Sequence, residues 1–204
     1  MRTTSSVLVA GLLGLAGLLP AADLFDYKDL RVGAATVGTS SEVRSTASGV
    51  ASTTSKEKWD SAQRLSLDAV VGVDLVLIGV AGGVGIVHDR RRGDSTTEEA
   101  YTGRLQAGPY LDFGPLTLEV LGQVGVGNAK LKMDGLSDST ATRTEYGAVL
   151  NILFPIPALP LVVGANVGVL HSESSHSVDI ASIPTDLKLT DADYTAGILV
   201  GWRF

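Results

Sequence analysis

The residues with the clearest chemical potential lie close together near position 170. His171, Ser172, Glu173 and His176 combine a hydroxyl nucleophile, two imidazoles and a carboxylate, which are the groups of Ser–His acyl transfer. The alternating polar and apolar residues around them indicate a β-strand, however, and neighbours on one strand point to opposite faces. His171 and Ser172 are therefore poorly placed to form a nucleophile–base pair, and no oxyanion hole is identifiable.

Three further clusters could bind ligands from loops. Arg90-Arg91-Arg92 could contact the phosphates of lipopolysaccharide through bidentate hydrogen bonds, and Arg92-Gly93-Asp94 matches an adhesion tripeptide, a match that also arises by chance. Asp186, Asp191 and Asp193 could supply oxygen ligands to a divalent cation. Solvated loop charges explain the arginine and aspartate clusters more simply, so we predict no metal site and no cofactor. Because His171 and Ser172 are poorly placed as a nucleophile–base pair, we also predict no enzymatic activity.

A different set of charged residues recurs at alternate positions of apolar segments. The set comprises Arg31, Arg64, Asp68, Arg104, Glu119, Glu145 and Arg203, with Asp29 as a further candidate. The signs nearly balance, and buried charges are tolerated when they are paired and hydrogen-bonded. On the inner face of a closed sheet these residues would form a salt-bridged network. That network would be a structural filling, with a gate or a narrow ion path as the alternative.

Eight segments of alternating hydrophobicity would position these charges. They span about residues 27–38, 60–73, 75–88, 100–112, 116–130, 141–154, 159–173 and 191–204, and a period of two is the strand period. Inward glycines on the segment 75–88 would make room for long side chains. The connections alternate between tight turns near 73–74, 113–115 and 155–157 and longer polar segments at 39–59, 89–99, 131–140 and 174–190. This plan predicts an all-β fold, namely an eight-stranded antiparallel up-and-down transmembrane β-barrel.

Aromatic residues lie near both ends of the predicted strands. We assign them to two aromatic girdles at the membrane interfaces, comprising Tyr27, Trp59, Tyr101, Phe113, Tyr146, Phe154, Tyr194 and Trp202. A soluble β-sandwich does not need one apolar face shared by every strand. A soluble barrel that holds an apolar ligand would have the opposite polarity, with its apolar side chains inside.

The beginning of the chain and its composition agree with export. Residues 1–22 contain Arg2, an apolar run at 7–19 and small residues before Asp23, which indicates a signal peptide. The apolar run is too short to cross a bilayer as a helix. Residues 23–204 would form one barrel domain without disulfides, since cysteine is absent. The net charge of −6 gives no support for nucleic-acid binding.

The last predicted strand has an aromatic-rich apolar face that ends at Phe204. This ending is similar to the C-terminal assembly signal of bacterial outer-membrane proteins, with Trp202 and Phe204 as its aromatic residues. It departs from that signal at Leu199, where a glycine is usual; the glycines here are Gly197 and Gly201. Together with the strand pattern, this ending makes residues 27–204 resemble the small eight-stranded outer-membrane barrels of the outer-membrane protein A and X type.

The resemblance implies a multi-pass protein of the bacterial outer membrane. Its expected partners are outer-membrane lipid and lipopolysaccharide, the barrel-assembly machinery and an unidentified surface ligand, but no nucleic acid, and we expect a monomer. An eight-stranded barrel has room inside only for its own side chains, so the expected role is structural or a surface interaction through polar extracellular loops. A narrow channel for ions or small solutes is the alternative, and a lipid A-modifying enzyme is a further one.

Overall fold

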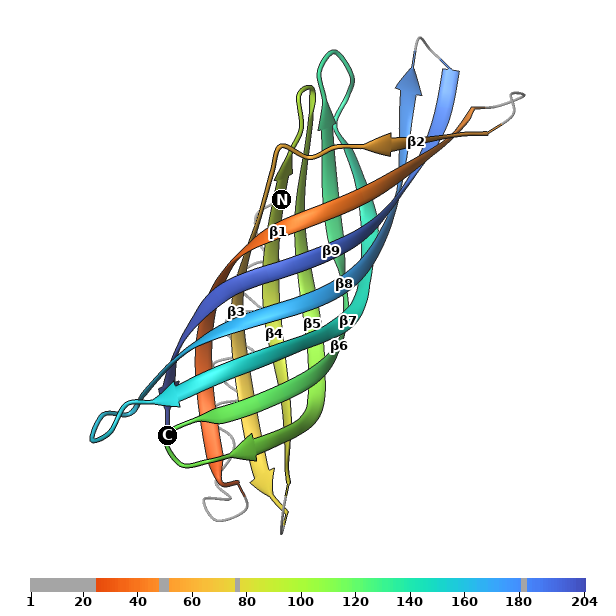
Figure 1. Cartoon of the computed structure of the whole chain (residues 1–204). Helices are drawn as coiled ribbons and strands as arrows, with labels where there is room; N and C mark the ends of the chain where they lie inside the picture. Colours follow the sequence, from red (N-terminus) through yellow and green to blue (C-terminus); the bar gives the residue numbers. More distant parts are fainter. Residues whose placement is uncertain (1–24, 48–51, 76–77, 181–182) are drawn as a thin grey trace, which may run out of the picture.

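The computed structural model describes residues 25–47, 52–75, 78–180 and 183–204, so the predicted signal peptide at 1–22 lies outside the described residues. Eight long antiparallel strands close into a barrel (Figure 1). They are β1 (Tyr27–Ala47), β3 (Ser61–Asp74), β4 (Gly79–Arg92), β5 (Thr96–Asp112), β6 (Thr117–Met133), β7 (Ser139–Pro155), β8 (Leu161–Ile180) and β9 (Ile183–Arg203). Each strand pairs with the next, and β1 closes the barrel on β9. The predicted eight-stranded antiparallel barrel is confirmed.

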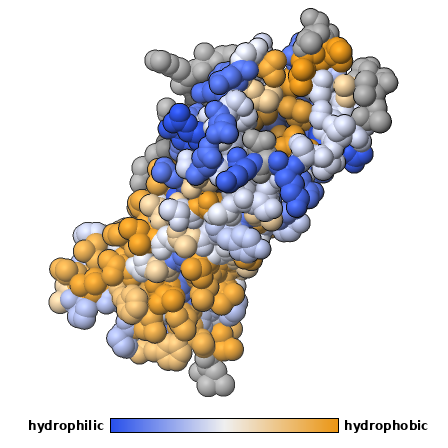
Figure 2. Space-filling model, turned by 45° about the horizontal axis from the view of Figure 1, so that its top comes forward, coloured by the Kyte–Doolittle hydropathy of each residue, from blue (hydrophilic) through white to orange (hydrophobic). Residues whose placement is uncertain are grey.

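The alternation of side chains decides which residues face outward. Val80 and Val124 lie on the outer surface with 48% and 57% of their area exposed, whereas their strand neighbours Ala81 and Gln123 are buried inside. Figure 2 shows hydrophobic residues covering the lower end of the molecule and hydrophilic residues over much of its upper half, with a smaller hydrophobic group at the top. An apolar outer surface around a polar interior is the arrangement that a lipid environment selects. Within the described residues, no helix is long and apolar enough to cross a membrane.

Inward glycines on β4 make room for long side chains, as the sequence predicts. A Cβ atom built on Gly79 would lie 2.0 Å from the ring of Tyr110, and one on Gly85 would lie 1.9 Å from the carboxylate of Asp68. No carbon atom fits at those distances. These two glycines therefore let a ring and an ion-paired carboxylate lie directly against the barrel wall.

The strands extend farther than the sequence predicts at the end where the longer connections lie. Residues 89–92, 96–99, 131–133, 139–140 and 174–180 continue the ladders instead of forming loops, and β8 pairs with β9 as far as Ile180 and Ile183. These segments are rich in Ser, Thr and Asp, a composition typical of loops. Outside a membrane, however, a strand can be polar on its outer face and still satisfy its backbone through pairing. The loop assignments at 89–99 and 174–190 are therefore wrong for most of their lengths.

A short strand in the first connection adds to this extension. β2 (Thr53–Glu57) pairs with β1 between Ser41 and Ser45. We call β2, residues 41–47 of β1, 175–180 of β8 and 183–191 of β9 the surface sheet. It lies at the upper end of the barrel in Figure 1, where β2 runs beside β1 and the ends of β8 and β9 rise next to it. An apolar cluster lies beneath it, made by Trp59, Leu131, Val178, Leu187 and Leu189.

Candidate functional site

The interior near the start of β1 and the end of β9 holds the first of three charged groups, which we call the lower tier. Arg31 and Glu119 form a bidentate pair, with N–O distances of 2.6 and 2.7 Å. Tyr27 donates to Glu119 at 2.6 Å, while Asp29 pairs with Arg31 at 2.8 Å and with Arg203 at 2.8 Å. Two guanidinium groups thus balance two carboxylates. The bidentate geometry is the strongest form of such a pair.

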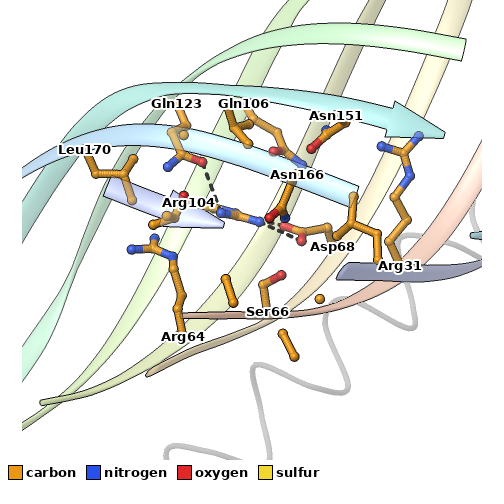
Figure 3. A pocket seen from close by; sticks show the side chains of 17 residues that line it. Arg31, Arg64, Ser66, Asp68, Arg104, Gln106, Gln123, Asn151, Asn166 and Leu170 are labelled. Atoms are coloured by element: carbon orange, nitrogen blue, oxygen red, sulfur yellow. Dashed lines mark hydrogen bonds and ion pairs between the residues drawn. The ribbon is translucent and has the colours of Figure 1, made fainter. Parts of the chain in front are cut away.

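The middle of the barrel holds the second group, the middle tier. Arg104 donates to both oxygens of Asp68, at 2.9 and 2.7 Å, and to Gln123 at 3.0 Å (Figure 3). The adjacent cavity, which Arg31 and Arg64 also line, has a volume of about 30 Å³. A cavity of that size holds one or two water molecules. The interior is therefore filled by its own side chains at this level.

The third group, the upper tier, lies toward the surface sheet. It comprises the arginines 64, 91 and 143 and the carboxylates of Asp89, Glu98, Glu145, Asp191 and Asp193. Arg64 bridges Glu145 at 2.6 Å and Asp89 at 3.2 Å. Arg143 pairs with Glu98 at 2.9 Å. Because each of these eight residues is at most 5% exposed, their pairs are shielded from bulk solvent, and charges interact more strongly there than at the protein surface.

The structure places all seven predicted interior residues inside the barrel, divided among the three tiers. Arg31 pairs with Glu119, Arg104 with Asp68, and Arg64 with Glu145, while Arg203 joins the lower tier through Asp29. Whether this network serves as a structural filling stays a proposal.

Sequence reasoning missed most of the upper tier. Arg91 was assigned to a loop that could bind phosphate, but it is 2% exposed and pairs with Asp191 and Asp193 inside the barrel. Those two aspartates do not join Asp186 in a cation site, because Asp186 lies on the outer face and accepts a hydrogen bond from Ser177 at 2.6 Å. The sequence does contain a signal that places Arg91 inside the barrel, because the strand period continues through residues 85, 87, 89 and 91.

The candidate Ser–His pair is divided between the two faces of β8. Ser172 is buried and donates to Asp191 at 3.2 Å, whereas the His171 ring lies outside, 5.0 Å from the ring of Tyr146. His176 lies farther along β8, outside the membrane, and is 0% exposed. Burial lowers the pKa of His176 below its ordinary value.

Six of the eight predicted girdle residues lie on the outer surface. They are Tyr101, Phe113, Tyr146, Phe154, Tyr194 and Trp202, each 46–66% exposed. The assignments of Tyr27 and Trp59 to the girdles are wrong, since these residues are only 4% and 9% exposed. Tyr27 shares the inner face of β1 with Asp29 and Arg31, a parity that the sequence already contained. Trp59 lies between β2 and β3 and donates to Ser41 at 2.6 Å inside the upper end of the barrel.

The two residues of the expected assembly signal lie at the end of β9. Trp202 and Phe204 are 48% and 72% exposed. The backbone N–H of Phe204 donates to the carbonyl of Lys28 at 2.9 Å, which holds the last residue against β1. Their role in assembly stays a prediction.

Comparison with known proteins gives similarity in structure only. No protein-family model and no curated sequence matches the chain. The outer membrane protein OprG from Pseudomonas aeruginosa is 14% identical with a TM-score of 0.53, over 89% of this chain and 97% of OprG. The outer membrane protease OmpT from Escherichia coli is 7% identical with a TM-score of 0.50, over 88% and 97% of the two chains. Neisserial surface protein A is 16% identical with a TM-score of 0.46, over 85% and 96%.

Closed antiparallel pairing, an apolar outer surface and a charged, filled interior occur together in this chain. Its similarity to OprG covers nearly the whole of both chains. The protein therefore has the fold of the bacterial outer-membrane β-barrels, and this barrel fits a multi-pass location in that membrane.

Proposed function

We propose that this protein is a non-conducting outer-membrane barrel that acts as a structural body and interacts with partners through its surface sheet. The observation that carries the proposal is the filled interior. Three tiers of buried ion pairs occupy the barrel, and the cavity at its middle has a volume of about 30 Å³.

Conduction would require these pairs to separate. Arg31 and Glu119 are 2% and 0% exposed, and breaking a buried pair of this kind costs about 3–5 kcal/mol. An open aqueous channel is a property of barrels with roughly 16 strands, while eight strands leave room only for side chains. The buried pairs and the strand number therefore both favour a closed interior.

The surface sheet is the part of the barrel best placed to meet a partner. It lies at the upper end of the barrel, and its outward residues include Glu42, Arg44, Lys56 and Lys188, which are exposed. The apolar cluster beneath it, with Trp59 at 9% exposure, gives this sheet a core of its own. Binding residues commonly lie on surface elements that a rigid scaffold positions.

The arrangement of Ser172 and His171 gives no support to an acyl-transfer enzyme. The Ser172 hydroxyl is committed to Asp191 in the interior, and the His171 ring faces outward. A nucleophile and its base must lie within hydrogen-bond reach of one another. We therefore propose a role without catalysis.

Planar-bilayer conductance of the refolded chain tests the proposal. We expect silence from protein that shows the compact, heat-sensitive mobility of a folded barrel on gels. Discrete conductance steps that change with Arg104→Gln but not with Lys188→Gln would overturn it, because Arg104 lies in the middle tier and Lys188 on the outer surface. Such steps would make the protein a narrow channel.

A further inference from the structure

Four cationic side chains form two rows on the outer surface of the upper half of the barrel. They are Arg90 and Arg92 on β4 and Lys130 and Lys132 on β6, and we call them the basic patch. Across the intervening strand β5, Arg90 is aligned with Glu99 and then Lys130, while Arg92 is aligned with Thr97 and then Lys132. Among the described residues of these two rows, Glu99 is the single carboxylate.

The basic patch begins where the lipid-facing surface ends. On β5, Tyr101 lies two residues from Glu99 toward the membrane, is 63% exposed and stacks on His88 with a centroid distance of 4.4 Å. Below it, Leu105 and Val126 are each 60% exposed. Exposed aromatic residues at the edge of an apolar band mark the headgroup level of a bilayer. The patch therefore lies at, and just outside, the lipid headgroups.

The cations of the patch are available to a ligand. The side chain of Arg90 is 60% exposed, and those of Lys130 and Lys132 are each 44% exposed. Glu99 is shared between Arg90 at 3.6 Å and Lys132 at 3.9 Å, and Lys130 pairs with Asp138 at 2.6 Å. Exposed ion pairs contribute little, so a phosphate group can replace these carboxylates.

The distribution of charge around the patch favours a ligand within the membrane over one that approaches from outside. The turns above it carry exposed carboxylates at Asp94, Asp134 and Asp138, which an anionic partner from outside would meet first. The neighbouring strand β7 has Thr140 and Thr142 instead of cations on its outer face. The four cations of the basic patch thus lie together on the two strands that flank β5, at headgroup height.

We infer that the basic patch binds the phosphate groups of a phosphorylated lipid in the outer leaflet, which in this membrane is lipopolysaccharide. Arginine and lysine bind phosphate through charge-assisted hydrogen bonds, and cations near a membrane surface strengthen binding to anionic headgroups. This inference rests on the membrane location and is independent of the closed interior and of the surface sheet.

The test is a titration of the refolded full chain, in neutral detergent, with purified lipopolysaccharide. The patch variant carries Arg90→Gln, Arg92→Gln, Lys130→Gln and Lys132→Gln. A matched control carries Arg44→Gln, Lys56→Gln, Lys58→Gln and Lys188→Gln, which remove the same charge elsewhere on the upper surface. Heat-sensitive gel mobility verifies that each variant is folded.

We expect the patch variant to lose about tenfold or more in affinity and the control to stay within about threefold of the unaltered protein. Glu99→Gln should bind more tightly than the unaltered protein, because it removes the carboxylate that competes with phosphate. Lipopolysaccharide stripped of its phosphates should bind the unaltered protein as weakly as intact lipopolysaccharide binds the patch variant. Equal losses in the patch and control variants, or equal binding of the two lipids, would overturn the inference.

Discussion

Glu119→Gln should destabilise the folded barrel strongly, because Glu119 is the acceptor on which the lower tier depends. The carboxylate is 0% exposed and accepts four hydrogen bonds, two from Arg31 and one each from Tyr27 and Asn151. Without its charge, the Arg31 and Arg203 guanidinium groups share the single carboxylate of Asp29. Leaving a buried charge without compensation costs about 3–5 kcal/mol, and we expect a loss in that range.

The measurement is urea unfolding of the protein folded in lipid vesicles, followed by tryptophan fluorescence and by gel mobility. Glu173→Gln is the matched control. Glu173 pairs with Lys188 at 2.8 Å, but its side chain is 42% exposed, so the loss of this pair should cost less than about 1 kcal/mol.

A double variant separates the electrostatic account from a simple packing defect. Arg31→Met with Glu119→Gln removes both charges and leaves Asp29 paired with Arg203. Replacing both members of a buried pair is often nearly neutral, so the double variant should be more stable than Glu119→Gln alone. The reasoning is refuted if Glu119→Gln costs less than about 1 kcal/mol. It is also refuted if the stability lost in the double variant equals the sum of the losses in Arg31→Met and Glu119→Gln measured separately.

Two other predictions concern the outer surface and pH. Val124→Arg should cost about 2–4 kcal/mol of unfolding free energy in vesicles, whereas Val80→Arg, one residue from the start of β4 at Gly79, and Thr142→Arg, beyond the upper girdle, should each cost less than about 1 kcal/mol; equal effects would contradict the assigned membrane level. Burial, with a smaller effect from the Arg143 charge, lowers the pKa of His176, so the unfolded chain binds this proton more readily than the folded chain. The stability that neutral His176 contributes is present above its ordinary pKa near 6.5 and is lost as the pH falls below it. His176→Phe should therefore flatten the pH dependence of stability between about pH 7 and 5, and an unchanged slope would exclude His176 as its source.

Much of this barrel could be predicted from the sequence because its surroundings impose a period of two. Lipid on one side and a crowded interior on the other sort alternate residues, so Val80 and Val124 could be assigned outward and Arg104 and Glu119 inward without a structure. Tyr27 follows the same rule, because its position in β1 places it on the inner face with Asp29 and Arg31. Its aromatic side chain has the residue type of a girdle, but the strand period decides its face.

Beyond the membrane, the separation of apolar outer residues from polar inner residues weakens, and strands become harder to predict from the sequence. Water accepts polar side chains on the outer face of a strand, so the extended ends of β8 and β9 had the composition of loops. Arg91 was hidden in the same way, because its flanking arginines face solvent while it turns inward. Parity remained informative there, but the segments in which it applied could not be recognised.

The strand pattern, the lipid-facing surface and the identity of most interior charges follow from the amino-acid sequence alone. The tertiary structure sets which charges pair, since Arg31 and Glu119 are 88 residues apart along the chain. It also decided the division into three tiers and the alignment of Arg90 with Lys130 across β5. The face to which a side chain points follows from the local strand period, whereas its partners depend on the register and closure of the whole sheet.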